Sequence, residues 1–181
     1  ADAYTDLQAA IFSCTAMEET DIWVAAGTYK PTTSTTRTIS FSMQENVYIY
    51  GGFAGIEQCR EDRDWKKNVT TLSGDIGTAG NTSDNSYHVI TGANDSTLDG
   101  FVVTGGNSYY DGGGMYNMDC SPAVANCTFL GNRASGDGGG MYNDNSSTSV
   151  NNCTFSGNSA AYGGGMCNYG CNLTIGNSTF T

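Results

Sequence analysis

The 181-residue chain is poor in charged residues, in proline and in long apolar segments. Charged residues make up 14 % of it, against roughly a quarter in average proteins. Two prolines are too few for collagen or for a proline-rich linker. No apolar run approaches the roughly 18 residues that a membrane-spanning helix needs. We therefore expect no membrane insertion of this segment.

Basic residues are especially scarce. Seven Lys and Arg stand against 18 Asp and Glu, which gives a net charge of −11. Nucleic acids and anionic membranes both require a basic face, so neither is an expected partner. Six of the seven basic residues lie within residues 1–67, and Arg133 alone follows them. An acidic, lysine-poor surface rich in Gly, Asn, Ser and Thr predicts a secreted or cell-surface protein.

The cysteines give no metal or redox motif. They are Cys14, Cys59, Cys120, Cys127, Cys153, Cys167 and Cys171. Because their number is odd, at least one is free or pairs between chains. No CxxC motif occurs, which argues against zinc and thioredoxin-like sites. Cys167 and Cys171 are candidates for a disulfide, and Cys14 and Cys59 for a second one, whereas Cys127 and Cys153 are predicted to be small buried side chains.

Two motifs repeat in phase along the second half of the chain. GGGMYN occupies residues 112–117 and 138–143, and GGGMCN occupies residues 163–168. The pattern Asn-x-Thr-Phe ends at Phe129, Phe155 and Phe180. Both motifs recur at offsets of 26 and then 25 residues. A period of this length predicts stacked repeats that share one core.

Each repeat contains short alternating runs of apolar and polar residues, which is the pattern of β-strands. No part of a repeat has helical periodicity, and the patterns of leucine-rich, ankyrin and tetratricopeptide repeats are absent. The sequence therefore predicts an all-β, single-stranded parallel β-helix with about 25 residues in each regular coil. Chain chirality favours a right-handed one. We expect a single domain over residues 1–181, with irregular coils over 21–95 and regular repeats over 96–181.

Stacking of coils about 4.8 Å apart would place equivalent side chains in columns. The predicted inward columns contain aromatic, thioether and thiol side chains, and a corner column contains amides that bond along the stack. These columns are Phe129, Phe155 and Phe180; Met115, Met141 and Met166; Cys127 and Cys153; and Asn132 and Asn158. We interpret all four as structural elements of the core.

The first part of the chain differs from the repeats. Residues 5–8 form a capping box that opens with Thr5, and apolar residues at helical spacing predict a short helix over 5–15. We expect this helix to cap the first coil, because an open coil exposes its core and its backbone. No such cap is expected at residues 180–181. The open coil at these residues is predicted to pair with a second copy of the chain or with flanking β-helix coils.

Several segments resemble a known group of proteins. Residues 23–31, 49–55, 63–65, 72–75 and 84–89 are similar to the N-terminal part of large secreted bacterial proteins with right-handed parallel β-helix repeats. The GG-Met-Tyr and Phe-x-x-Asn motifs resemble the repeats of polymorphic outer membrane proteins, although Met replaces the usual small or aliphatic residue. The resemblance implies a pectin-lyase-like solenoid and a role as an adhesin, surface stalk or matrix component.

Pectin-degrading enzymes share this fold class, so a catalytic site has to be considered. The polygalacturonase-like motifs Asn-Thr-Asp, Gly-His-Gly and Arg-x-Lys are absent, and no Asp cluster surrounds Arg133 as in pectate lyases. The single histidine, His88, is expected to pack against neighbouring residues rather than to act as a general base. We therefore expect no enzyme activity and no required cofactor. Asp75, Asn81 and Asp84, followed by Asn85, are candidate ligands for a structural Ca²⁺, although their spacing is not that of an EF-hand.

The sequence as a whole predicts a non-catalytic extracellular module that is structural or adhesive. Exposed rows of Asn, Thr, Ser and Tyr suit glycans or other surface proteins as partners. One alternative is a filament subunit that stacks end to end. A less favoured alternative is a polysaccharide lyase or glycoside hydrolase.

Overall fold

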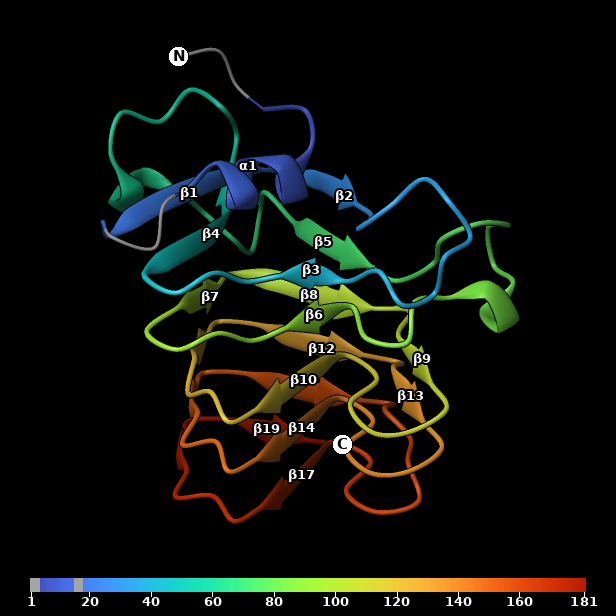
Figure 1. Ribbon diagram of the computed structural model, residues 1–181. Coiled ribbons are helices and arrows are strands. Elements are labelled where there is room, and N and C mark those ends of the chain that lie inside the picture. Colours follow the sequence, from blue (N-terminus) through green and yellow to red (C-terminus); the bar gives the residue numbers. More distant parts are fainter. Residues whose placement is uncertain (1–3, 15–17) are drawn as a thin grey trace.

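The chain forms an all-parallel β-solenoid of about six coils, with about 26 residues in each (Figure 1). The computed structural model describes residues 4–14 and 18–181. Three sheets, called A, B and C here, run along the stack, and a two-stranded sheet D lies between B and C in the chain order. Because the strands of each sheet pair in parallel with their counterparts in the adjacent coils, the predicted parallel β-solenoid is confirmed.

Sheet A begins each coil, and sheet B follows it after a short corner except where residues 54–69 lie between β4 and β5. The strands of sheet A are β1 (Thr20–Ala25), β4 (Val47–Phe53), β7 (Thr97–Asp99), β11 (Ala123–Ala125), β15 (Ser149–Asn151) and β18 (Thr174–Gly176). Those of sheet B are β2 (Gly27–Tyr29), β5 (Thr70–Ser73), β8 (Phe101–Thr104), β12 (Thr128–Leu130), β16 (Thr154–Ser156) and β19 (Thr179–Phe180).

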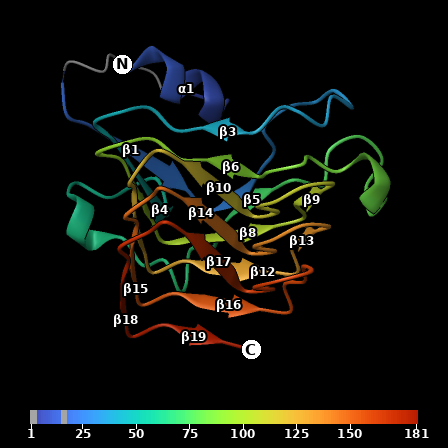
Figure 2. The ribbon, with the colours of Figure 1, turned by 60° about the horizontal axis from the view of Figure 1, so that its bottom comes forward.

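Sheet C completes the coil on the remaining side (Figure 2). Its strands are β3 (Phe41–Ser42), β6 (Ile90–Thr91), β10 (Met115–Met118), β14 (Met141–Asp144) and β17 (Met166–Tyr169). Sheet D contains β9 (Asn107–Ser108) and β13 (Arg133–Ala134).

The aromatic column lies in sheet B and faces the core. Phe129 pairs with Phe155, and Phe155 pairs with Phe180. Their rings stack with centroids 4.8 and 4.7 Å apart, at interplanar angles of 3° and 5°. Val103 lies opposite Phe129 in the preceding coil. This spacing matches the separation of neighbouring strands, so each ring packs against the next without leaving its strand.

Methionine and cysteine columns fill the rest of the core. Met115, Met141 and Met166 are register partners in sheet C. Cys127 and Cys153 are buried one coil apart, immediately before the paired strands β12 and β16. Burial raises the pKa of the Cys127 thiol, so it remains a neutral apolar group.

Two asparagine ladders run through the stack. Asn117 donates its amide to Asn143 Oδ1, and Asn143 donates to Asn168 Oδ1, each at 2.8 Å. In the second ladder, Asn132 Nδ2 donates to Asn158 Oδ1 at 3.1 Å. Asn143 both accepts and donates along its column, whereas Asn117 Oδ1, at the start of that ladder, is buried without a hydrogen-bond partner among the described residues.

The N-terminal end of the stack is covered by α1 (Leu7–Ser13). Its N-cap is Asp6, whose carboxylate accepts from Ala9 N at 3.1 Å, rather than the predicted Thr5. Thr5 and Asp6 are adjacent, and both residue types are common at the N-cap, so the sequence alone does not decide which of them caps the helix. The end of the predicted helix beyond Cys14 lies outside the described residues.

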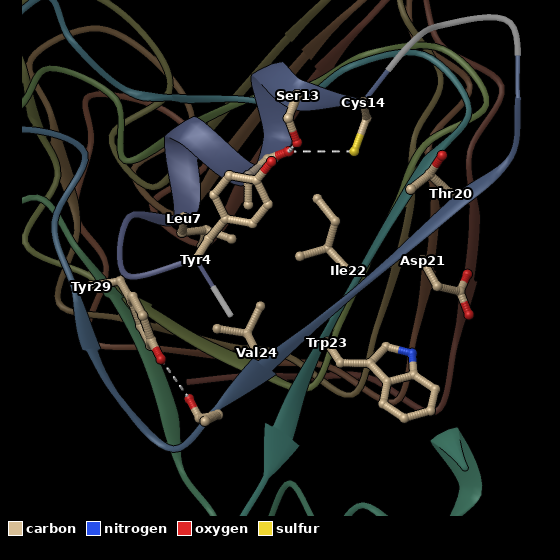
Figure 3. A pocket seen from close by; sticks show the side chains of 12 residues that line it. Tyr4, Leu7, Ser13, Cys14, Thr20, Asp21, Ile22, Trp23, Val24 and Tyr29 are labelled. Atoms are coloured by element: carbon tan, nitrogen blue, oxygen red, sulfur yellow. Dashed lines mark hydrogen bonds between the residues drawn. The ribbon is translucent and has the colours of Figure 1, made fainter. Parts of the chain in front are cut away.

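A hollow of about 360 Å³ remains between α1 and β1 (Figure 3). Ile22 and Val24 point from β1 toward the helix, whereas Asp21 and Trp23 point away from it. Leu7 contributes to the same apolar lining. The helix therefore covers the first coil without filling the space above it.

The irregular coils carry three excursions. Residues 30–40 and 74–89 leave the solenoid on one side, and residues 54–69 leave it on the other (upper left in Figure 1). The excursion over residues 54–69 contains the short 3₁₀ helix η1 (Arg60–Asp62), and the excursion over residues 74–89 contains η2 (Thr82–Asp84). In the described part of the chain, no helix is long and apolar enough to cross a membrane.

Candidate functional site

The candidate calcium ligands lie in the excursion over residues 74–89, but each is engaged locally. Both carboxylate oxygens of Asp75 accept from Gly80 N, at 3.1 and 3.2 Å. Asp84 Oδ2 accepts from Thr78 N and from Asn81 Nδ2. Among residues 4–14 and 18–181, no three His, Cys, Asp or Glu side chains gather as metal ligands. Asp84 Oδ1 and Asn85 Oδ1 are buried without a hydrogen-bond partner in the described part of the chain, so Ca²⁺ binding by this loop stays a prediction.

The candidate disulfides are not formed. All seven cysteines are free thiols. Cys167 lies in β17 opposite Tyr142, with Sγ 3.8 Å from Asp137 Oδ2. Cys171 lies beyond the next corner, where its Sγ donates to Asn143 O and accepts from Ser146 N. The two thiols belong to different columns, which is why four residues of separation do not bring them together. The exposed Cys59 and the half-buried Cys14 are likewise unpaired.

His88 belongs to an aromatic column on the outer face of sheet C. Its ring stacks on Tyr116 with centroids 4.7 Å apart, and Tyr116 stacks on Tyr142 at 5.6 Å. His88 Nδ1 lies 2.7 Å from Gly112 O, which fixes the ring. Burial lowers the pKa of His88, so the imidazole is neutral at pH 7. This setting is one of packing.

A polar hollow lies elsewhere, on the outer face of sheet B. It has a volume of about 380 Å³ and lies between the 54–69 excursion and strands β8, β12 and β16. We call it the Trp65 groove. Its polar and aromatic lining comes from Trp65, Lys66, Asn126, Thr128, Asn152 and Thr154.

Arg63 holds the excursion against the solenoid. Its guanidinium donates to Gly51 O at 2.9 Å and to Asp99 O at 3.1 Å. It also forms an ion pair with Asp99 Oδ1 at 2.8 Å, and both side chains are largely buried. The same guanidinium lies 5.2 Å from the centre of the Trp65 ring. One buried cation therefore fixes both the loop and the indole that lines the groove.

The backbone of the neighbouring coil leaves room for this contact. Gly100 has a φ of +85°, and a Cβ there would lie 2.8 Å from Arg63 Nη1 and 3.0 Å from Trp65 Cβ. A side chain at this corner would push the excursion away from the sheet. The glycine thus permits the close approach that closes one side of the groove.

A chain of polar contacts extends from Arg63 along the groove. Asp99 Oδ1 accepts from Asn126 Nδ2 at 2.7 Å, and Asn126 Oδ1 accepts in turn from Asn152 Nδ2. Asn126 and Asn152 have φ values of +53° and +54° at equivalent corners. Asparagine tolerates this left-handed conformation better than most residues. The corner geometry therefore places both amides on the rim of the groove.

Three polar side chains in the groove are unengaged. Thr128 and Thr154 are register partners on the outer face of sheet B, and their hydroxyls make no hydrogen bond within the described residues. The Lys66 ammonium has no carboxylate within salt-bridge distance in that same part of the chain. Free hydroxyls and a free ammonium beside an indole can bind a polyhydroxylated ligand.

No sequence motif predicted this groove. Trp65 and Lys66 lie in a non-repeating excursion, and more than 60 positions separate them from Thr128 in the chain. The available signal was the excursion itself, an insertion between two strands that carries both an aromatic residue and free basic residues. Its docking site on sheet B could not be derived from the repeat period.

Comparison with known proteins identifies the family to which the chain belongs. Residues 3–177 match a family described as "Protein of unknown function (DUF1565)". Neither a curated protein nor a solved structure shows a significant match to the chain.

Proposed function

The chain belongs to the DUF1565 family, and we propose that it is a non-catalytic extracellular β-solenoid module that binds a glycan in the Trp65 groove. The observation that carries the proposal is the pair of free hydroxyls of Thr128 and Thr154 beside Trp65. Sugars combine an apolar ring face with many hydroxyl groups, so an indole and a hydroxyl row match both parts.

The chemistry of the groove supports binding without catalysis. Glycosidases of the common kind use a pair of carboxyl groups across the scissile bond. No carboxylate is among the described residues that line the groove, and the neighbouring Asp99 is committed to the Arg63 ion pair and to the Asn126 amide. The remaining polar lining consists of hydroxyl, amide and ammonium groups, which do not form an acid–base pair at neutral pH.

Location outside the cell is supported by composition and by the repeats. An acidic surface rich in Asn, Ser, Thr and Gly is typical of secreted adhesive modules, and the Phe-x-x-Asn repeats resemble those of polymorphic outer membrane proteins. The long axial columns make the module stiff, because each strand is hydrogen-bonded to the next coil. A stiff rod that presents a lateral groove suits a surface stalk or matrix component.

A glycan array followed by calorimetry tests the proposal. We expect the chain to bind at least one class of glycan, and Thr128→Val together with Thr154→Val to weaken binding about tenfold or more, because each lost hydrogen bond costs about 1 kcal/mol. Thr174→Val, on the outer face of sheet A, is the matched control and should leave affinity unchanged. Absence of any glycan binding would overturn the function, and release of shorter products would overturn its non-catalytic part.

Self-association is a second candidate function, favoured by one observation. Ile175 and Phe180, in the last coil, are each 46 % exposed, whereas their equivalents Val150 and Phe155 are fully buried. An apolar surface with open strand edges can pair with a second copy of the chain or with flanking β-helix coils. Sedimentation should then show concentration-dependent dimers that Phe180→Ser abolishes. A monomer at all concentrations would overturn this candidate.

A further inference from the structure

The groove contains a feature that goes beyond general sugar binding. Resting on the proposed function, we propose that the Trp65 groove selects glycans that carry carboxylate groups, and that Lys66 recognises this charge. Lys66 lines the groove and also a second hollow of about 360 Å³, whose lining includes Asp62, Asp64 and Trp65. Because the second hollow carries carboxylates, the Trp65 groove is the place where Lys66 can meet an acidic sugar.

The charge distribution makes a free cation at this position notable. The chain has a net charge of −11, and Arg37, Arg60 and Arg63 are engaged within the fold, whereas Lys30 and Arg133 lie outside the groove. Arg60 forms ion pairs with Asp21 and Glu61, and Arg37 lies between two tyrosine rings. Within the described residues, the Lys66 and Lys67 ammonium groups have no carboxylate partner. These two side chains are therefore available to a ligand anion.

The nearest acidic side chain in sequence does not neutralise Lys66. Asp64 Oδ1 accepts from the backbone N–H groups of Lys66 and Lys67, both at 3.1 Å. The carboxylate thus closes the turn in which the two lysines lie. This arrangement fixes the backbone of Lys66 and leaves its ammonium exposed at the edge of the groove.

The electrostatics favour a carboxylated sugar over a neutral one. A strongly acidic protein repels acidic polysaccharides at long range, so binding requires a local positive charge at the contact itself. An ammonium–carboxylate contact at an exposed groove is modest in strength and is screened by salt. Trp65 and the hydroxyls of Thr128 and Thr154 would then supply the binding common to all sugars, and Lys66 the preference.

A matched panel of glycans tests the inference. The probes are hexamers of galacturonate, mannuronate and glucuronate, together with the methyl ester of each. We expect the wild-type chain to bind at least one free acid about three- to tenfold more tightly than its ester. That preference should shrink in 0.5 M NaCl. Lys66→Gln should abolish the preference for the acid over its ester, and Lys66→Arg should retain it.

Lys30→Gln is the control, because Lys30 is also exposed but lies outside the groove. It should leave the preference intact. Equal affinity for acids and esters, or a preference that survives Lys66→Gln, would overturn the role of Lys66 and leave the glycan-binding function standing. Failure to bind any acid, any ester or any neutral glycan would instead overturn the proposed function itself.

Discussion

Gln8 bonds to the main chain of Ser42 with both atoms of its side-chain amide. Its Oε1 accepts from Ser42 N at 2.8 Å, and its Nε2 donates to Ser42 O at 3.4 Å. Ser42 belongs to β3, the terminal strand of sheet C. A side chain of α1 therefore takes the place that another strand would occupy, and it satisfies backbone groups that would otherwise form an open sheet edge.

We expect Gln8→Ala to destabilise the protein by about 1–3 kcal/mol, because it leaves nearly buried backbone groups without partners. Urea unfolding, followed by circular dichroism, measures the change. Gln58→Ala is the control, since Gln58 is exposed and bonds only within its own loop. Equal stabilities of the two variants would show that α1 covers the end by apolar packing alone.

The asparagine ladder should be intolerant of substitution at its centre. Asn143 accepts from Asn117 and from Thr148 Oγ1, and it donates to Asn168. Asn143→Ala leaves these buried groups unpaired, so we expect a loss of about 2–4 kcal/mol in the free energy of unfolding. Asn151→Ala, on the exposed rim of sheet A, should cost less than about 0.5 kcal/mol. Comparable losses in thermal or urea unfolding would contradict a stabilising ladder.

Gly131 isolates the effect of backbone conformation at a corner. Its φ is +64°, and a Cβ there would meet no atom within 4 Å. Gly131→Ala should therefore cost about 1–2 kcal/mol through backbone strain alone. Gly131→Asn should cost less, because asparagine already occupies left-handed corners elsewhere in the stack. Urea unfolding of the two variants should show this order, and the reverse order would contradict it.

The stacking of the coils was predictable from the sequence because it is periodic. Offsets of 26 and 25 residues between Phe129, Phe155 and Phe180 are the same offsets that the strand register shows. A solenoid strand can bury its apolar face only against the same strand of the next coil, so sequence period and register coincide. The N-cap was placed one residue early because Thr5 and Asp6 are both suitable capping residue types.

The candidate site was not predictable in the same way. Trp65 meets Thr128 only because Arg63 inserts beside Gly100 and fixes the excursion on sheet B. A non-repeating loop has no counterpart one coil away, so the period carries no information about where it docks. The predicted Cys167–Cys171 disulfide is absent for a related reason. Proximity in the chain does not overcome the corner that separates their columns.

The thiols can be counted directly. Seven free cysteines predict seven reactive thiols in denaturant without reductant, whereas a Cys167–Cys171 disulfide would leave five. In the native protein we expect Cys59 to react readily because it is exposed. Cys127 should be protected, since it is buried and its pKa is raised by burial. Labelling with mass spectrometry measures both, and a peptide with a Cys167–Cys171 bridge would contradict the structure.

Ionisation of Tyr142 should lower the free energy of unfolding at alkaline pH. Burial, together with repulsion from Asp144 and Asp111, raises the pKa of its phenol to about 12. An unfolded tyrosine ionises near pH 10. The folded state therefore retains a proton that the unfolded state loses, so this contribution is complete below about pH 10 and declines as the pH rises to about 12.

Ultraviolet difference titration of the wild-type protein and Tyr142→Phe isolates this phenol. The difference curve should have its midpoint near pH 12. Asp144→Asn should move the midpoint down, because it removes one of the two repelling carboxylates. The variant Tyr142→Phe should also lose part of the decline in unfolding free energy at alkaline pH. A midpoint at the ordinary value near 10 would show that the phenol is fully hydrated and that the column Tyr116–Tyr142 is open to water.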